Sequence, residues 1–282
     1  MIFFRIFAKK QILMKIKKIL LPIAFLLLTL QLSAWGGLAH NTIAHIAQQN
    51  LTPEAEAEVA RLLNGRTMVY YAMWMDNARS LPEFDFMRTW HWANVDSGFT
   101  YETMPQYPSG DVITATELAI HKLTSAAYCD STKRVFLKIL IHTIGEIHCP
   151  MHAGRSTDRG GNDHPIIWFG QPSNLHRLWD GQILDRARSW SYTEWARNLT
   201  AHVTVSDIAE MQRGTPRDWF GETVVFAHYI YKHTPQNENL SFSYIHGMRI
   251  IDGQRRTFLS VAEQQLTAGG YRLAYVLNTM FY

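Results

Sequence analysis

An all-α fold, built as a single compact helical domain, is predicted by two features of the sequence. Apolar residues recur at three- and four-residue spacing over long stretches, as in TATELAIHKLTSAAY after Asp111 and in STKRVFLKILIHTIGEIHC before Pro150. No sustained alternation of apolar and polar residues appears, so little β-sheet is expected. Because we find no internal repeat, low-complexity tract or interdomain linker, one domain is the simplest interpretation.

Local signals place the helices along the chain. One is expected to begin at Thr52-Pro53, a cap residue followed by proline, and to end at Asn64-Gly65. Pro150 is expected to end the helix that precedes it, because proline has no N–H and clashes with the preceding turn. Further helices are expected to begin near Asn174, Tyr192, Pro216 and Thr257.

Two segments are predicted to be loops. Residues 95–110 are rich in Gly, Pro, Ser and aromatic side chains, and AGRSTDRGGNDHP covers residues 153–165. Loops held on a rigid helical scaffold are where binding residues usually lie.

Residues 1–34 are expected to be a signal peptide. Five lysines lie between Lys9 and Lys18, and an uncharged run of 12 residues follows from Ile19 to Leu30, which is too short to span a bilayer. The small residues of QLSA predict cleavage after Ala34, which would leave Trp35 as the new N-terminus. The protein is therefore predicted to be exported, either periplasmic or secreted, with no membrane anchor once the leader is removed.

Charge and cysteine content constrain the remaining chain, residues 35–282. It carries 21 Lys and Arg against 24 Asp and Glu, a net charge of −3, so overall charge does not argue for nucleic-acid binding. Any attraction to phosphate must come from a local site, and no stable protein partner is predicted. Cys129 and Cys149 could form a disulfide or be two small buried thiols, and the sequence leaves both alternatives open.

The stretches HTIGEIHCPMHAG and NLHRLWDGQ hold a cluster of residue types that bind zinc. His142 and Glu146 are four residues apart, as are His176 and Asp180, and on a helix this spacing brings two side chains to one face. His152 lies between the two pairs. Imidazole nitrogen and carboxylate oxygen are the ligands that zinc accepts when no thiolate is offered. Two such pairs suggest more than one metal ion.

Further ligand types lie upstream. Asp76 is followed 15 residues later by His91, and His40 lies five residues after Trp35. Each of these would be a weak signal alone, and for His40 alone the interpretation as a packed core histidine is the better one.

The whole set of motifs resembles the zinc-dependent single-strand nucleases and 3′-nucleotidases of the S1/P1 type from fungi and plants. The resemblance runs in order through WGGLAH, WMDNAR, HWAN, HTIGEIHCPMH, DRGGN and NLHRLWD. It implies a helical bundle with three zinc ions at the bottom of a cleft. It also implies cleavage of single-stranded DNA and RNA to 5′-nucleotides, together with 3′-nucleotidase activity.

The resemblance implies three ligand sets. The first zinc would be bound by Asp76, His91, His142 and Glu146. The second would be bound by His152, His176 and Asp180. The third would be bound by His40, Glu146 and the free amine and carbonyl oxygen of Trp35. Because an amide nitrogen cannot replace an amine lone pair, the uncleaved precursor is predicted to be nearly inactive.

The chain departs from the family pattern at two positions. The family usually has Asp where this chain has Glu146, whose side chain is one methylene longer. Zinc binding is expected to survive this change, whereas rate or metal preference is expected to differ. Cys149 stands where the family commonly has a polar residue, and we interpret it as structural rather than as a ligand. His148, about 240° round the helix from His142, is assigned to a supporting or packing role.

The resemblance also implies residues that contact substrate. Zinc lowers the pKa of bound water, and the resulting hydroxide would attack phosphorus at the site bridged by Glu146. Arg79 would bind the transition-state phosphoryl oxygens, although a surface ion pair is its structural alternative. Trp92 would stack on a nucleobase, with a core aromatic as the alternative, and Asn94 would bind the base edge. Asn162 would help to position phosphate or a ligand carboxylate.

Two other functions remain open at this point. A zinc-dependent phospholipase C shares the fold and metal pattern, but GGN and NLHRLWD, with Asp at position 180, favour the nuclease. A non-catalytic exported zinc-binding protein is the second alternative, and it is disfavoured because Arg79 and every other ligand are present.

Overall fold

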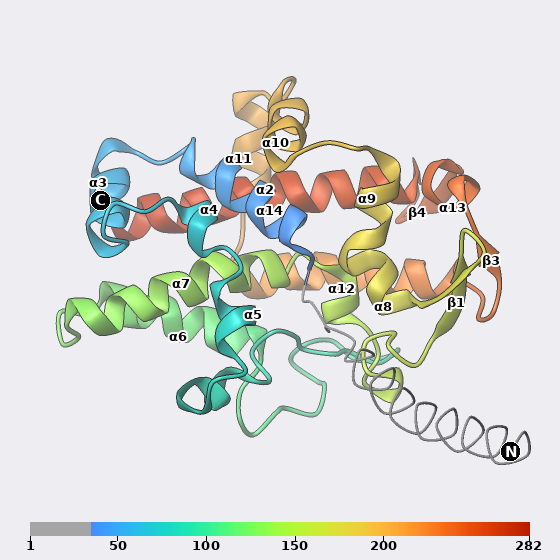
Figure 1. Ribbon diagram of the computed structural model, residues 1–282, viewed down its shortest axis with the longest axis horizontal. Coiled ribbons are helices and arrows are strands. Elements are labelled where there is room, and N and C mark those ends of the chain that lie inside the picture. Colours follow the sequence, from blue (N-terminus) through green and yellow to red (C-terminus); the bar gives the residue numbers. More distant parts are fainter. Residues whose placement is uncertain (1–34) are drawn as a thin grey trace, which may run out of the picture. The chain divides into compact units, whose positions relative to one another are not determined.

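Helices α2 (Gly37–Gln48), α7 (Asp130–Glu146) and α14 (Phe258–Met280) contact one another at the centre of the fold (Figure 1). The computed structural model describes residues 35–282, so the predicted leader, 1–34, lies outside the described residues. Helix α14 packs along α2 and also contacts α7. Because α14 is buried along most of its length, it belongs to the core rather than to the surface.

The chain between α2 and α6 covers one side of α7. Helix α3 (Pro53–Leu62) begins at the predicted cap, where the Thr52 hydroxyl accepts a hydrogen bond from the Ala55 N–H. Three short segments follow, namely α4 (Met68–Tyr71), α5 (Trp74–Ala78) and the 3₁₀ turn η1 (Pro82–Met87). Helices α3, α4 and α5 all contact α7, so residues distant in sequence are brought beside it.

Helix α6 (Val112–Thr124) packs along α7. A capping box defines its start, because the Asp111 carboxylate accepts from the N–H of Thr114 while the Thr114 hydroxyl accepts from the N–H of Asp111. The helix ends at Thr124 rather than at Tyr128, where the predicted segment ended.

After α7 the chain turns repeatedly before it returns to the core. Helix α7 ends at Glu146, and Pro150 begins the 3₁₀ turn η2 (Pro150–Ala153), as the proline predicts. The remaining segments are η3 (Ser156–Asp158), α8 (Leu175–Arg177), the π-helical turn η4 (Leu178–Gln182), α9 (Ile183–Ala187), α10 (Tyr192–Thr200), α11 (Val205–Met211), α12 (Pro216–Lys232) and α13 (Phe242–His246). The predicted helix starts near Asn174, Tyr192, Pro216 and Thr257 are confirmed.

The little sheet that exists consists of short strands. Strand β1 (Pro165–Trp168) pairs antiparallel with β2 (Gln171–Asn174) and parallel with β3 (Asn239–Leu240). A separate hairpin joins β4 (Arg249–Ile251) to β5 (Gln254–Arg256). The prediction of a mainly helical fold with little sheet is therefore confirmed.

Helix α2 was not among the predicted helices. It begins beside two glycines, and no side chain caps its first turn. Its stability comes instead from tertiary packing, since it contacts α14, α10 and α4. Sequence signals at a helix start cannot report such contacts.

Two glycines allow α14 to approach α2 closely. A Cβ on Gly269 would lie 3.0 Å from Ile43 Cδ1, and one on Gly270 would lie 2.5 Å from both Cβ and Cγ2 of Ile46. Because Ile46 is completely buried, its side chain has no open space into which it could move.

Replacing Gly270 with alanine is expected to lower the free energy of unfolding by about 1–3 kcal/mol, because overpacking against Ile46 outweighs the helical preference for alanine. The matched control is Gly221→Ala in α12, where an added Cβ would meet no atom within 4 Å. That control is expected to raise stability by roughly 0.5–1 kcal/mol. Urea unfolding of both variants checks this, and equal effects would contradict it.

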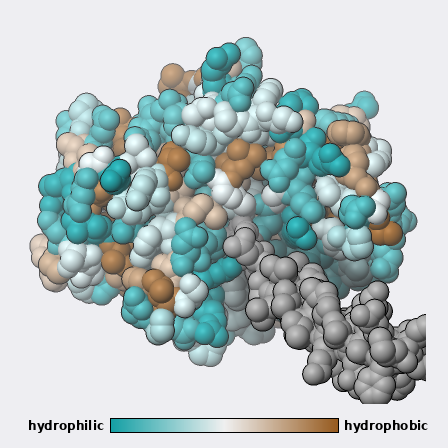
Figure 2. Space-filling view, in the orientation of Figure 1, coloured by the Kyte–Doolittle hydropathy of each residue, from teal (hydrophilic) through white to brown (hydrophobic). Residues whose placement is uncertain are grey.

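The face shown in Figure 2 is mostly hydrophilic, with small hydrophobic groups scattered between polar ones. Within residues 35–282, no helix combines the length and hydropathy needed to cross a membrane. Both cysteines are free, so the disulfide alternative is wrong, and the alternative of two buried thiols holds for Cys149 but not for Cys129, which is exposed.

Candidate metal centre

The end of α7 places two predicted ligands in a fully buried environment. Helices α2, α5 and α14 all pack against α7, and the side chains of His142 and Glu146 are 0% exposed. Removing a charged carboxylate from water is unfavourable unless it is paired or binds a metal. The atoms around Glu146 therefore decide what this site can do.

Asp76, His91, His142 and Glu146 form the first group, in which one ligand atom from each lies within 4.8 Å of the others. Glu146 Oε1 lies 2.8 Å from His142 Nε2 and 2.9 Å from His91 Nδ1. Asp76 reaches the group from α5, with Oδ1 3.6 Å from His91 Nδ1. Two imidazoles and two carboxylates form a donor set that suits zinc.

A second group forms where η2 meets η4. His152 Nε2 lies 3.3 Å from Asp180 Oδ1, and Cys149 Sγ lies 3.8 Å from the same oxygen. His176 stacks on His152 with ring centroids 5.2 Å apart, and its Nε2 lies 3.8 Å from Asp180 Oδ2. The structure therefore brings Cys149 together with two of the residues predicted for the second zinc, His152 and Asp180, and places the third, His176, beside them.

The second group lacks the continuous α-helix that the spacing of His176 and Asp180 predicts. His176 lies in α8 and Asp180 in the π-helical turn η4, so the two are not on one continuous α-helix. Their side chains still converge. A π-helical turn is a local departure from regular helix that often occurs at functional sites.

Glu146 connects the two groups. Its Oε2 lies 2.7 Å from His152 Nδ1 and 3.6 Å from His40 Nε2, although neither contact is a hydrogen bond. Burial alone would raise the pKa of Glu146, but the nearby His152 and His142 outweigh it and hold that pKa well below its usual value. Glu146 is therefore an ionised carboxylate between imidazoles of both groups.

Several buried polar atoms in the two groups lack a hydrogen-bond partner. They are Nδ1 and Nε2 of His40, both carboxylate oxygens of Asp76, Nε2 of His91, Oε2 of Glu146 and Nδ1 of His152. An unsatisfied buried polar atom costs about 1–3 kcal/mol. Burial lowers the pKa of His40, His91 and His176, which favours the neutral imidazole that binds metal. At His142 and His152 burial acts in the same direction, but neighbouring acidic groups outweigh it and raise the pKa. The residues therefore fit bound cations.

Backbone carbonyls orient two of these imidazoles. His142 Nδ1 donates to the carbonyl of Ala72 at 2.7 Å, and His176 Nδ1 donates to that of Gly160 at 2.8 Å. Each contact leaves Nε2 facing its group. Metal-binding histidines are usually held in this way by the second ring nitrogen.

Trp35 and His40, the residues predicted for the third zinc, lie at the start of the described chain. Trp35 is 1% exposed, and the N–H of the next residue, Gly36, donates to the carbonyl of Asp180. His40 stacks on His142 with ring centroids 4.0 Å apart. This places the beginning of α2 against both η4 and the end of α7.

Gly145 makes room for His40 and was missed in the sequence. A Cβ at this position would lie 2.5 Å from His40 Nδ1 and 2.7 Å from its Cε1. The only sequence signal was a glycine inside an otherwise regular helical pattern, which suggests a close packing contact.

Replacing Gly145 with alanine is expected to displace His40 and to prevent binding of one of the three zinc ions that the resemblance predicts. We expect the rate on single-stranded DNA to fall by about tenfold. Zinc per chain and initial rate are the measurements, with Gly221→Ala as the control for a helical glycine with open surroundings. A variant that retains three ions would contradict this role.

The predicted substrate residues lie beside the first group. Arg79 Nη1 lies 3.6 Å from Asp76 Oδ1, with its side chain 31% exposed. Trp92 is partly buried next to His91, and Tyr107 lies close enough to Trp92 and Asn94 for both to influence its pKa, which burial raises. Tyr107 was not predicted, since a single tyrosine in a loop gives no signal.

Asn162 and His148 form hydrogen bonds with residues outside the two ligand groups. The Asn162 amide donates to the Arg159 carbonyl at 2.9 Å, which stabilises its own loop. His148 faces away from the ligand groups, where its Nε2 accepts from Arg272 at 3.0 Å and its Nδ1 donates to the Ile144 carbonyl. Burial, together with the charge of Arg272, lowers the pKa of His148 to about 3.

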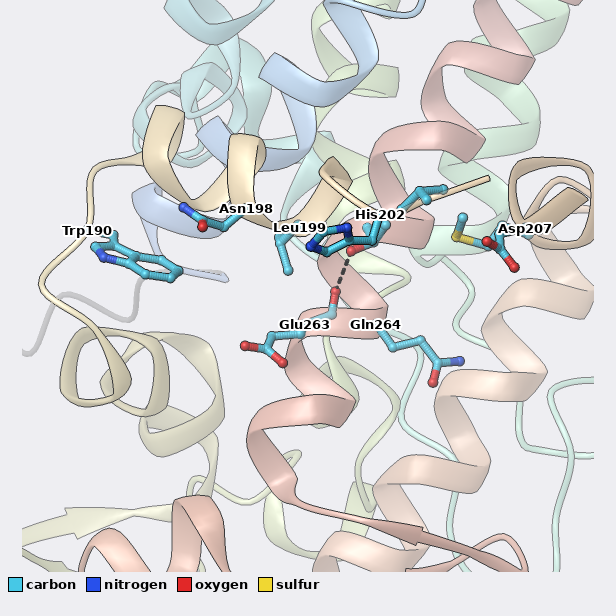
Figure 3. A pocket seen from close by; sticks show the side chains of 10 residues that line it. Trp190, Asn198, Leu199, His202, Asp207, Glu263 and Gln264 are labelled. Atoms are coloured by element: carbon cyan, nitrogen blue, oxygen red, sulfur yellow. Dashed lines mark hydrogen bonds between the residues drawn. The ribbon is translucent and has the colours of Figure 1, made fainter. Parts of the chain in front are cut away.

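A separate pocket of about 430 Å³ lies between α10, α11 and α14 (Figure 3). Trp190, Asn198, His202 and Glu263 are among its lining residues. None of the residues that line it is a predicted ligand or substrate residue, so we assign the chemistry to the metal-ligand groups.

The sequence is similar to those of known nucleases. The chain is 25% identical to Endonuclease 3 of Arabidopsis thaliana over 272 residues, covering 88% of this chain and 89% of the relative. It is 28% identical to Nuclease S1 of Aspergillus oryzae, covering 60% and 61%. It is 26% identical to Nuclease P1 of Penicillium citrinum, covering 56% and 65%.

The sequence profile described as S1/P1 Nuclease matches residues 35–282, which is every residue that the structure describes. The resemblance carried by the motifs and the all-helical fold expected from it are thereby confirmed. The chain belongs to the S1/P1 nuclease family.

Proposed function

We propose that this protein is an exported zinc-dependent nuclease. It cleaves single-stranded DNA and RNA to 5′-nucleotides and removes phosphate from 3′-nucleotides, using three zinc ions. The observation that best supports this is the pair of ligand groups joined through the buried carboxylate of Glu146. Two-metal sites of this kind stabilise the attacking and leaving oxygens of a phosphoryl displacement.

Each of the three proposed zinc ions would be bound by residues described above. Asp76, His91, His142 and Glu146 would hold the first, and His152, His176 and Asp180 would hold the second. His40, Glu146 and the amine and carbonyl of Trp35 would hold the third. When bound, zinc supplies Lewis acidity and makes water a stronger acid.

The chain's own residues position the substrate. Arg79, held next to Asp76, would donate to the phosphoryl oxygens as negative charge develops on them. Trp92 would stack on an unpaired base, and Asn94 would hydrogen-bond its edge. A paired base must leave its duplex to reach this position, so duplex DNA should be a poor substrate.

The test uses protein that begins at Trp35, incubated with single-stranded DNA, RNA, duplex DNA and phosphatidylcholine, with zinc or with a chelator. We expect 5′-nucleotides from the single strands only, with all activity lost in the chelator. Cleavage of lipid alone would replace the proposal with a phospholipase. Bound zinc with no turnover of any substrate would support a non-catalytic protein.

A further inference from the structure

Cys149 lies at the junction between α7 and η2, beside the second group. Its side chain is completely buried, and Sγ lies 3.8 Å from Asp180 Oδ1. Sγ, a ring nitrogen of His152 and an oxygen of Asp180 all lie within 4.8 Å of one another. The sulfur is therefore one of three different ligand atoms that converge on one point.

The separations within this group match those around a tetrahedral zinc ion. Bonds of about 2.0–2.1 Å to nitrogen, about 2.0–2.2 Å to oxygen and about 2.3 Å to sulfur place neighbouring ligand atoms about 3.3–3.7 Å apart. The separation from His152 Nε2 to Asp180 Oδ1 is 3.3 Å, and that from Cys149 Sγ to the same oxygen is 3.8 Å. His176 is not one of these three, and its Nε2, 3.8 Å from Asp180 Oδ2, would have to move towards them to complete the geometry.

Packing alone does not account for this position. A buried thiol that only fills space behaves as a small hydrophobic group. Cys149 instead faces the carboxylate of Asp180 and the ring of His152. Thiolate is also the softest ligand in the set, and zinc binds it readily.

We propose that Cys149 is a ligand of the second zinc, as a thiolate, together with His152, His176 and Asp180. This revises our interpretation of Cys149 as a structural residue, and it rests on the proposed zinc site. The S–H proton passes to water as the zinc–sulfur bond forms. Four protein ligands fill a tetrahedral ion, so this ion is retained more strongly than one held by three.

The test replaces zinc with Co²⁺ in protein that begins at Trp35 and records the near-ultraviolet spectrum. A thiolate ligand produces a sulfur-to-cobalt charge-transfer band that imidazole and carboxylate do not. We expect the band in the parent protein and its loss in Cys149→Ser. The matched control is Cys129→Ser, which removes the exposed cysteine and should keep the band. Cys149→Ser should also release one ion to a chelator at least about tenfold faster.

The outcomes separate this inference from the proposed function. Three bound Co²⁺ ions and digestion of single-stranded DNA without the band would overturn thiolate ligation alone. Loss of the band in Cys129→Ser would overturn it too, because the other cysteine would then be the ligand. No bound metal and no digestion would overturn both proposals. If Cys149→Ser does not fold, the spectra of the parent and of Cys129→Ser still decide whether a cysteine other than Cys129 binds the cobalt.

Discussion

Replacing Glu146 with glutamine is expected to lower kcat/KM on single-stranded DNA by about 10³-fold or more and to leave fewer than three zinc ions per chain. The amide preserves the size of the side chain but removes the negative charge. That charge lies 2.8 Å from His142, 2.9 Å from His91 and 2.7 Å from His152, so its loss affects both ligand groups together. Zinc content and kcat/KM, measured on the same preparation, check the prediction.

Glu146→Asp is the matched control, because it keeps the charge and restores the residue that the family usually has. The aspartate side chain is one methylene shorter, so its carboxylate would lie farther from His152 but remain at the end of α7 beside His142. We expect three zinc ions and activity within about tenfold of the parent. If aspartate reduced activity strongly and glutamine did not, the length of the side chain rather than its charge would be decisive.

Much of the candidate site could be predicted from the sequence because five of its nine predicted ligands lie in two short motifs. His142 and Glu146 are separated by one helical turn, and that local geometry survives in the structure. Regular elements with clear end signals were predicted for the same reason, as at Thr52 and Pro150. Such features depend on residues close together in the chain.

Long-range packing explains what the sequence could not show. Helix α2 lacks a capping side chain and forms against α14, which is more than two hundred residues later. The role of Gly145 depends on the position of His40 in the fold, and the role of Cys149 depends on the position of Asp180. The π-helical turn at Asp180 could not be predicted either, because the apolar pattern of a π-helical turn does not differ from that of an α-helix.

A protein that retains Ala34 before Trp35 is expected to bind two zinc ions instead of three and to be at least about 10²-fold less active than one that begins at Trp35. The added peptide bond converts the amine of Trp35 into an amide, whose nitrogen has no lone pair to donate. The backbone beyond it is anchored in both forms, because the Gly36 N–H donates to the Asp180 carbonyl. The extension therefore changes mainly one ligand atom.

Trp35→Phe in protein that begins at position 35 separates the amine from the indole ring. This variant keeps the free amine and the carbonyl, so it should retain the third ion. Because Trp35 is 1% exposed, it should also lose about 1–3 kcal/mol of stability to a smaller ring. Zinc stoichiometry, unfolding free energy and rate together distinguish the two effects. Loss of the third ion in Trp35→Phe but not in the extended protein would assign the role of Trp35 to its ring, and the precursor would then be active.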